Sequence, residues 1–329
     1  MPESPLRLSK VGEADAEVIL LDGNKYLFST DDFSAEDQFR ETDPYSLGWN
    51  IACGAISDIV AAGGKPLTYS QAMAVSPTWN EDFIDKFSEG ISRVLQKYGI
   101  SFIGGDLGVS DNWHYTASVI GKPGSKIIDR KGCAIGDKIF ITGKIGAGNL
   151  EAALKMCSEN SKLELLLKSV KTRFHTQEDI SEILCEYATA AIDTSDGVFA
   201  ALQTLAEINN CGFMIDNLPY ITKANMAAKL LNLPKLLLCL GECGEYEILF
   251  TCKQENIPQL QKVAMEKEIA LFELGEISDK SNKILTEKDK QFDFSDYNVS
   301  ARDFTDLKEY LSMMQCEIMK RENKDLGEL

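Results

Sequence analysis

The hydrophobic positions along the chain recur with strand spacing in some segments and with helical spacing in others. Residues 17–30 contain two runs of strand-forming residues around Asp22-Gly23, which predicts two short strands joined by a turn. A helix is predicted from Asp43-Pro44 to Gly63-Gly64, because Asp can cap a helix, Pro suits its first turn and Gly ends it. Further strands are predicted at 66–76, 100–105, 113–121, 138–142, 189–193, 213–216 and 246–252, and further helices at 80–98, 149–157, 196–210 and 303–324.

The order of these elements indicates the fold class. Strands and helices alternate irregularly, which favours two α+β units over one doubly wound sheet. The chain has 329 residues, more than one small core normally serves. The polar segment 122–132 contains Pro and Gly and is the predicted linker. The predicted divisions are an N-terminal α/β domain at 1–124, a C-terminal α+β domain at 125–302 and a helical tail at 303–329.

The charge balance excludes one large class of partner. The formal net charge is −17, with 51 acidic against 34 basic residues, whereas nucleic-acid binding rests on Lys and Arg neutralising phosphates. No apolar run reaches the ~20 residues that cross a bilayer, and Met1–Lys10 lacks the apolar core of a signal peptide. We therefore expect a soluble, cytoplasmic protein with no nucleic-acid or membrane partner.

The cysteines and histidines do not predict a zinc site. The nine cysteines are dispersed and never spaced C-x-x-C, and His114 and His175 are the only histidines. Most cysteines stand in apolar stretches, as Cys53 and Cys239 do, where Cys behaves as a small hydrophobic residue.

Asp58 is the most informative residue of the sequence. At about 100° per residue it lies close to Leu47 and Ile51 around the predicted helix, on the apolar face. An unpaired carboxylate is costly in such a place. Two explanations are open, a structural salt bridge to Lys or Arg and a bound metal or metal-bound phosphate, of which the second is the sharper.

Other acidic residues stand at the ends of predicted strands and helices. Asp31 and Asp32 end one strand, Asp106 follows Gly104-Gly105, and Asp193 precedes Ser195-Asp196 at the start of a helix. Turn formation or helix capping explains most of these singly. Together they place about six acids at element ends, and so many converging carboxylates would repel one another without cations. Mg²⁺ bound by carboxylates, water and substrate phosphates fits a nucleotide enzyme.

The glycine-rich loop 143–148 joins a predicted strand to a predicted helix. Backbone N–H groups in such a loop can hold an anion, although the loop is equally consistent with a tight turn. It matches neither G-x-G-x-x-G nor the Walker A pattern.

Six segments, in this order, resemble motifs of thiamine-monophosphate kinase, a branch of the aminoimidazole ribonucleotide synthetase superfamily. FSTDDF is similar to the T-T-D segment, NIACGAISDIVAAGGKPL to the N-L-S-D-L-A-A-M-G-A-x-P-L helix and IGGDL to G-G-D-T. RKGCAIGDKIFITGKIGAG, AAIDTSDGVFAAL and GEYEILFT resemble three later motifs. The similarity runs from about Gly12 to Thr251.

The resemblance implies a fold, a ligand and a set of residues. It implies a first domain that forms a β-barrel across a homodimer, a C-terminal α+β domain, and ATP bound with several Mg²⁺ ions. The implied metal ligands are Asp15 (with Glu13 as the alternative register), Thr30 through its hydroxyl or carbonyl, Asp31, Asp58, Asp106, Asp193 and Asp196. The implied nucleotide contacts are Thr30, Gly105, Asp106, Arg130 and Ser195, and the implied catalytic group is Asp58, Asp106, Asp196 and Arg130.

The sequence departs from the family on the acceptor side. Gln38 stands where the family has a substrate-side His, and Gly244 stands where it has a Glu. The tail has no clear counterpart of the aromatic residue that would stack on the acceptor. The leading interpretation is an ATP- and Mg-dependent kinase that converts thiamine monophosphate to thiamine diphosphate, with weak turnover on that acceptor. The alternatives are a related ATP-dependent enzyme with a different acceptor and a nucleotide-binding protein without turnover.

Overall fold

The computed structural model of the chain describes residues 4–10, 12–34, 43–156, 172–175 and 179–324. These residues form a mixed α+β structure with two sheets, in agreement with the predicted fold class. The chain divides into two compact units, the first made of 1–130 with 171–193 and the second of 131–170 with 194–329.

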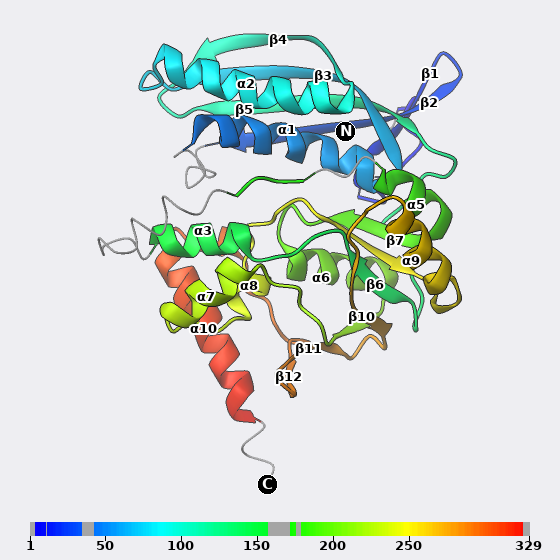
Figure 1. Ribbon diagram of the computed structural model, residues 1–329, viewed down its shortest axis with the longest axis vertical. Coiled ribbons are helices and arrows are strands. Elements are labelled where there is room, and N and C mark those ends of the chain that lie inside the picture. Colours follow the sequence, from blue (N-terminus) through cyan, green and yellow to red (C-terminus); the bar gives the residue numbers. More distant parts are fainter. Residues whose placement is uncertain (1–3, 11, 35–42, 157–171, 176–178, 325–329) are drawn as a thin grey trace. The chain divides into compact units, whose positions relative to one another are not determined.

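The first unit is built on a sheet with strand order β1-β2-β5-β3-β4 (Figure 1). The hairpin of β1 and β2 turns through Asp22 and Gly23, whose φ angles of 48° and 76° are those a tight two-residue hairpin requires. The predicted strands of this part of the chain are thereby confirmed. Their bounds are β1 Glu17–Leu21, β2 Asn24–Ser34, β3 Gly64–Val75, β4 Ser101–Val109 and β5 His114–Pro123.

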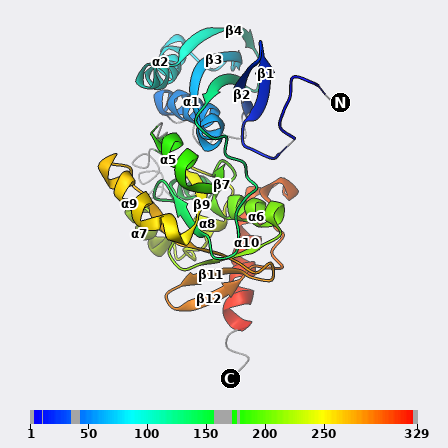
Figure 2. The same cartoon turned by 90° about the vertical axis from the view of Figure 1, so that its right-hand side faces the viewer.

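Two helices cover one face of this sheet, α1 (Pro44–Ala61) and α2 (Glu81–Tyr98) (Figures 1 and 2). Helix α1 packs on β2, β3 and β5 and is buried along most of its length. The two helices approach closely because of glycine: a Cβ at Gly48 would overlap the carbonyl oxygen of Phe87, and a Cβ at Gly90 that of Tyr45. The side chains of β2 and β5 that point to this face therefore pack against helix α1.

The first unit is completed by residues 171–193, which follow a stretch of chain that belongs to the second unit. Helix α5 (Ile180–Tyr187) leads into strand β7 (Ala188–Asp193). The buried Asn50 of α1 donates to the carbonyl of Thr172 at 2.8 Å and accepts from the N–H of Phe174 at 2.9 Å. Ser181 donates to the carbonyl of Gly64 at 2.7 Å. These bonds attach the later segment to α1 and to the start of β3.

The second unit contains a mixed sheet in which β6 pairs antiparallel with β9 and β10, and β8 pairs antiparallel with β10 and parallel with β11. The final helix, predicted as an amphipathic tail, buries Tyr310, Met314 and Ile318 at helical spacing. The bounds are β6 Lys138–Ile141, α3 Ala147–Met156, α6 Val198–Asn209, β8 Gly212–Ile215, α7 Thr222–Leu230, α8 Leu237–Leu240, β9 Ile248–Cys252, α9 Ile257–Glu266, β10 Phe272–Ser278, β11 Lys283–Glu287, β12 Lys290–Asp293 and α10 Leu307–Lys324. Within the described part of the chain, no helix has the length and apolar character that spanning a membrane demands.

Candidate metal centre

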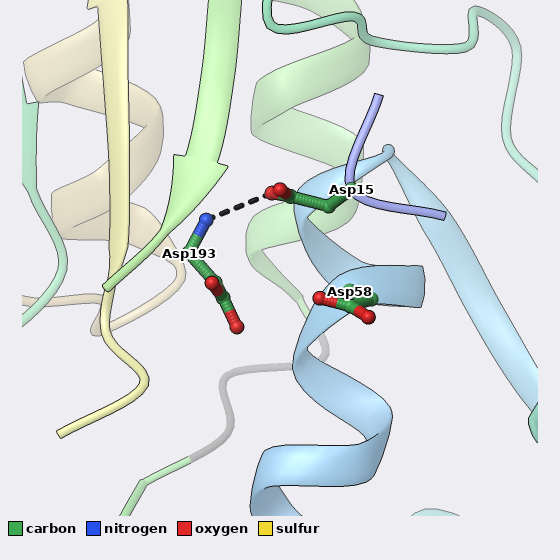
Figure 3. Close-up of side chains that lie close together, drawn as sticks. All are labelled: Asp15, Asp58 and Asp193. Atoms are coloured by element: carbon green, nitrogen blue, oxygen red, sulfur yellow. Dashed lines mark hydrogen bonds between the residues drawn. The ribbon is translucent and has the colours of Figure 1, made fainter. Parts of the chain in front are cut away.

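Three aspartates of the first unit bring their carboxylate oxygens together. Asp15 lies just before β1, Asp58 lies on α1, and Asp193 is the last residue of β7 (Figure 3). One carboxylate oxygen from each lies within 4.8 Å of the other two. Residues far apart in sequence thus converge on one point, as the ligands of a bound cation do.

Hydrogen bonds hold each of the three side chains in place. The N–H of Asp193 donates to Asp15 Oδ2 at 2.8 Å, as the dashed line in Figure 3 marks. The hydroxyl of Ser29, on β2, donates to Asp58, and the hydroxyl of Ser57, on α1, donates to Asp193. Uncharged backbone and hydroxyl donors therefore orient the cluster, and they supply no positive charge to it.

Asp31 adds a fourth carboxylate to this group. It follows Ser29 by two residues on β2, and alternate residues of a strand point to the same face. Its side chain therefore points to the α1 side of the sheet, where Ser29 contacts Asp58. The charges of Asp31 and Asp58 interact strongly enough to raise the pKa of Asp58.

Arg130 is the cation that pairs with this group. Its Nε donates to Asp15 Oδ1 at 2.6 Å, and its Nη2 forms an ion pair with the same oxygen. The side chain of Asp15 is fully buried, whereas a quarter of the Arg130 side chain is exposed. Among the described residues, Asp58 has a hydroxyl partner and no Lys or Arg partner, so the salt-bridge explanation of Asp58 is not supported.

The acids of the cluster resist ionisation. Burial, and then the charge of Asp193, raises the pKa of Asp15 to about 7, although Arg130 opposes the shift. Burial and the charge of Asp193 also raise the pKa of Asp31 to about 7. Burial and the charges of Asp31, Asp193 and Asp15 raise the pKa of Asp58 well above its usual range. Several carboxylates facing one arginine retain an excess of negative charge, and divalent cations would neutralise it.

These shifts predict that the stability of the Mg²⁺-free protein falls as pH rises and that the stabilisation by Mg²⁺ grows over the same range. An acid whose pKa is raised by folding stabilises the folded state below its unfolded pKa, and that stability is lost as pH rises through the folded pKa. For Asp15 and Asp31 the window runs from about 4 to about 7. In EDTA, we expect the melting temperature to fall between about pH 5 and pH 8, and the stabilisation by Mg²⁺ to grow over the same range. A Mg²⁺ effect equal at both pH values, measured by calorimetry, would contradict this expectation.

Other predicted ligands of the first unit lie elsewhere on its sheet. The side chain of Thr30 points to the face opposite Asp31, and its hydroxyl pairs with that of Ser118 at 3.0 Å. Only the carbonyl of Thr30 is left for the predicted metal role on the α1 side. Gly105 and Asp106 are exposed on the edge strand β4. A Cβ at Gly105 would overlap the carbonyl oxygen of Gln71, so the strand requires glycine there.

The remaining predicted ligands belong to the second unit. Asp196 is 64% exposed and lies 3.4 Å from Arg302, which is 80% exposed. The carbonyl of Ser195 accepts from the N–H of Gly244 at 3.2 Å. Helix α6 begins after Gly197, and neither Ser195 nor Asp196 caps it. Helix capping therefore does not explain these two polar residues.

The glycine-rich loop holds an anion that belongs to the chain itself. The N–H groups of Gly146 and Gly148 donate to Glu245 Oε1 at 3.0 and 2.8 Å. Glu245 is buried, and so is Glu247, whose carboxylate accepts from the hydroxyl of Thr142. Burial raises the pKa of Glu247 to about 7. The loop is an anion-binding turn, as its sequence allows, and its ligand is an internal carboxylate.

The sequence interpretation missed the residues that orient the cluster. Ser29 and Ser57 each precede or neighbour a predicted ligand, but serine is too common in strands and helices to be noticed there. The available signal was position: Ser29 shares a strand face with Asp31, and Ser57 adjoins Asp58. Gln38, predicted to replace a substrate-side histidine, lies outside the described residues.

Known proteins have sequences similar to that of this chain. The family model of the AIR synthase related protein, N-terminal domain, matches residues 13–122. Thiamine-monophosphate kinase of Buchnera aphidicola subsp. Schizaphis graminum is 29% identical over 80% of this chain and 82% of its own length. That of Pyrococcus horikoshii is 27% identical over 65% of this chain and 68% of its own. This chain thus matches the AIR synthase related family over its N-terminal part and is similar to thiamine-monophosphate kinases over most of its length.

Solved structures share the fold of this thiamine-monophosphate kinase-like chain. AaThiL complexed with AMPPCP and TMP superposes with a TM-score of 0.71 at 21% identity, over 87% of this chain and 89% of that one. The hydrogenase maturation protein HypE of E. coli superposes with a TM-score of 0.68 at 16% identity, over 82% and 85%. At these identities the structures establish the shared fold alone.

Proposed function

We propose that the protein is an ATP- and Mg²⁺-dependent phosphotransferase of the thiamine-monophosphate kinase type. The observation that carries the proposal is the convergence of Asp15, Asp58 and Asp193 within 4.8 Å, with Asp31 beside them. Buried carboxylates with raised pKa values need cations, and Mg²⁺ brings substrate phosphates with it. The relatives named thiamine-monophosphate kinase, and the AaThiL complex with AMPPCP and TMP, support the same chemistry.

The positions of the residues support the roles that we propose for them. Asp15, Asp31, Asp58 and Asp193 would hold Mg²⁺, which supplies charge neutralisation for a transferring phosphoryl group. Ser29 and Ser57 keep two of these carboxylates oriented. Arg130 neutralises Asp15 and keeps part of its guanidinium exposed, where it can contact a phosphate oxygen.

Further residues are assigned on the strength of the motif resemblance. We assign Asp196 to metal binding and Ser195 to nucleotide binding; both belong to the second unit. Gly105 and Asp106 on β4 are assigned to the nucleotide. Phosphoryl transfer of this kind depends on positioning and charge neutralisation, with no covalent intermediate on the protein.

The proposed reaction moves the γ-phosphoryl group of ATP to the phosphate of thiamine monophosphate. One observation favours the alternative, in which the phosphoryl group goes to an acceptor other than thiamine monophosphate. A Cβ at Gly244 would overlap the carbonyl oxygens of Thr194 and Ser195, so the backbone here admits no larger residue. A glutamate contact to the acceptor from this position is therefore excluded, and the loss of a positioning contact can cost about a hundredfold in rate.

A two-stage assay tests the proposal. The first stage measures Mg²⁺-dependent ATP binding by calorimetry, and the second incubates the protein with ATP, Mg²⁺ and thiamine monophosphate and identifies products by mass spectrometry. We expect Mg²⁺-dependent binding and formation of thiamine diphosphate at a rate well below the ~10 s⁻¹ of typical enzymes. Binding with hydrolysis but no thiamine diphosphate would favour another acceptor. No ATP binding would refute the proposal.

The proposed assembly is a homodimer in which the edge of the first sheet is covered. Strand β4 is an edge strand, and its large apolar residues are exposed: Phe102, Ile103, Leu107 and Val109 are 52–71% accessible. A long, apolar, unpaired edge is normally covered by another chain or element. Pairing of two first units about a two-fold axis, into a closed barrel, would cover it.

A further inference from the structure

Two cysteines of the second unit lie against each other although they are far apart in sequence. Cys133 lies in the segment before β6, and Cys211 lies in the turn between α6 and β8. Their Sγ atoms are 3.9 Å apart. The sequence interpretation treats cysteines in this chain as small hydrophobic residues, but this pair is an exception because the two thiols contact each other.

The backbone around both cysteines is held by hydrogen bonds within the unit. The N–H of Gly132 donates to Asn209 Oδ1 at 2.8 Å, which attaches the segment of Cys133 to the end of α6. The N–H of Cys211 donates to the carbonyl of Ala206 at 2.9 Å, after Asn210 turns the chain with a φ of 52°. A disulfide has an S–S length of about 2.05 Å. Bond formation therefore requires the two sulfur atoms, now 3.9 Å apart, to approach each other by about 2 Å.

The two thiols differ in reactivity and in access. Cys211 is 6% exposed, whereas Cys133 is partly exposed. The hydrogen bond between the two thiols lowers the pKa of Cys211 and raises the pKa of Cys133. The thiolate is the nucleophile in thiol oxidation, so Cys211 is the group that reacts first. Its small exposure selects a small oxidant.

We propose that Cys133 and Cys211 form a redox modification site at which a peroxide produces a reversible disulfide. The Cys211 thiolate attacks one oxygen of hydrogen peroxide, the O–O bond breaks, and a sulfenic acid and hydroxide form. Cys133 then attacks the sulfenic sulfur, an S–S bond forms, and the hydroxyl group leaves and takes up the proton of Cys133 as water. Two thiols are oxidised and one peroxide is reduced to two water molecules.

The disulfide would act on the stability of the second unit. It closes a covalent ring of roughly 80 residues, and cross-links that close long rings restrict the unfolded chain most. The ring joins the segment just after Arg130 to the C-terminal end of α6. The N-terminal end of α6 lies just after Asp196 in the sequence. The oxidised protein should therefore unfold at a higher denaturant concentration. This proposal is independent of the proposed kinase activity.

The test uses the full chain under native conditions. The protein is treated with equimolar hydrogen peroxide, alkylated and digested without reduction. We expect one cross-linked peptide pair containing Cys133 and Cys211, lighter by two hydrogen atoms and separated again by dithiothreitol. The urea midpoint should rise on oxidation and return on reduction. Cys133→Ser should accumulate a sulfenic acid on Cys211 that dimedone traps, whereas Cys211→Ser should leave Cys133 unoxidised.

Cys316→Ser is the matched control. Cys316 is exposed on α10 and has no part in the pair, so this variant should form the cross-link to the same extent as the wild type. Oxidation of Cys316 without any link between Cys133 and Cys211 would overturn the proposal. So would a link that forms only in the urea-unfolded protein. An unchanged urea midpoint in the cross-linked protein would refute the predicted gain in stability.

Discussion

Asp58→Asn is expected to weaken Mg-ATP binding by at least about 100-fold, the upper end of the loss seen even for residues that only support metal ligands. The same change should stabilise the Mg²⁺-free protein at neutral pH. Both effects have one cause: Asp58 is an acid whose burial and neighbours, Asp31, Asp193 and Asp15, raise its pKa. Asparagine removes the repelled charge and still accepts the hydroxyl of Ser29 through its amide oxygen.

The two effects are measured on the same sample. Calorimetry gives the Mg-ATP affinity, and thermal unfolding in EDTA gives the stability. Asp32→Asn is the matched control, because Asp32 lies next to Asp31 in sequence but points to the opposite, exposed face of β2, where it accepts from Thr116 at 2.7 Å. It should leave both quantities near their wild-type values. Unchanged Mg-ATP affinity in folded Asp58→Asn would exclude Asp58 from the metal site.

Leu107→Glu is expected to convert the proposed dimer into a monomer. Leu107 is 66% exposed on the edge strand β4, so the substitution disturbs no core contact within one chain. In a dimer that covers this strand, both copies would bury an unpaired carboxylate. At ~2 kcal/mol or more for each copy, the dimer dissociation constant should rise at least about 1000-fold.

Light scattering across a micromolar concentration series measures this constant. Met265→Glu is the matched control, since Met265 is 82% exposed on α9 of the second unit and should tolerate the charge without loss of the dimer. The thermal stability of dilute Leu107→Glu should equal that of the dissociated wild type. A wild-type protein that is monomeric at these concentrations would contradict the proposed covering of β4.

The predicted elements were recovered because their signals are local. The turn at Asp22-Gly23 needs only its two residues, and the amphipathic spacing of α10 needs only its own sequence. Helical spacing also sufficed to show that Asp58 points inward from α1. Such inferences require no knowledge of what the helix packs against.

The arrangement of the site could not be obtained in the same way. The pairing of Arg130 with Asp15 and the bond from Ser57 to Asp193 join residues more than a hundred positions apart. The occupation of the glycine loop by Glu245 depends on a segment that folds back onto it. Patterns within one short segment cannot predict contacts between residues that are far apart in sequence. The separation of Thr30 from Asp31 could have been foreseen, because neighbouring strand residues point to opposite faces.

The first unit is assembled from two stretches of the chain that leave the ribosome at different times. Residues 131–170 belong to the second unit, yet they are synthesised before 171–193, which belong to the first. Until those later residues emerge, Asn50 of α1 has neither of its backbone partners at 172 and 174, and Asp193 cannot join Asp15 and Asp58. A nascent chain of 130 residues therefore contains the strands of the first sheet without the complete candidate metal centre, which we expect to form only when β7 has been translated.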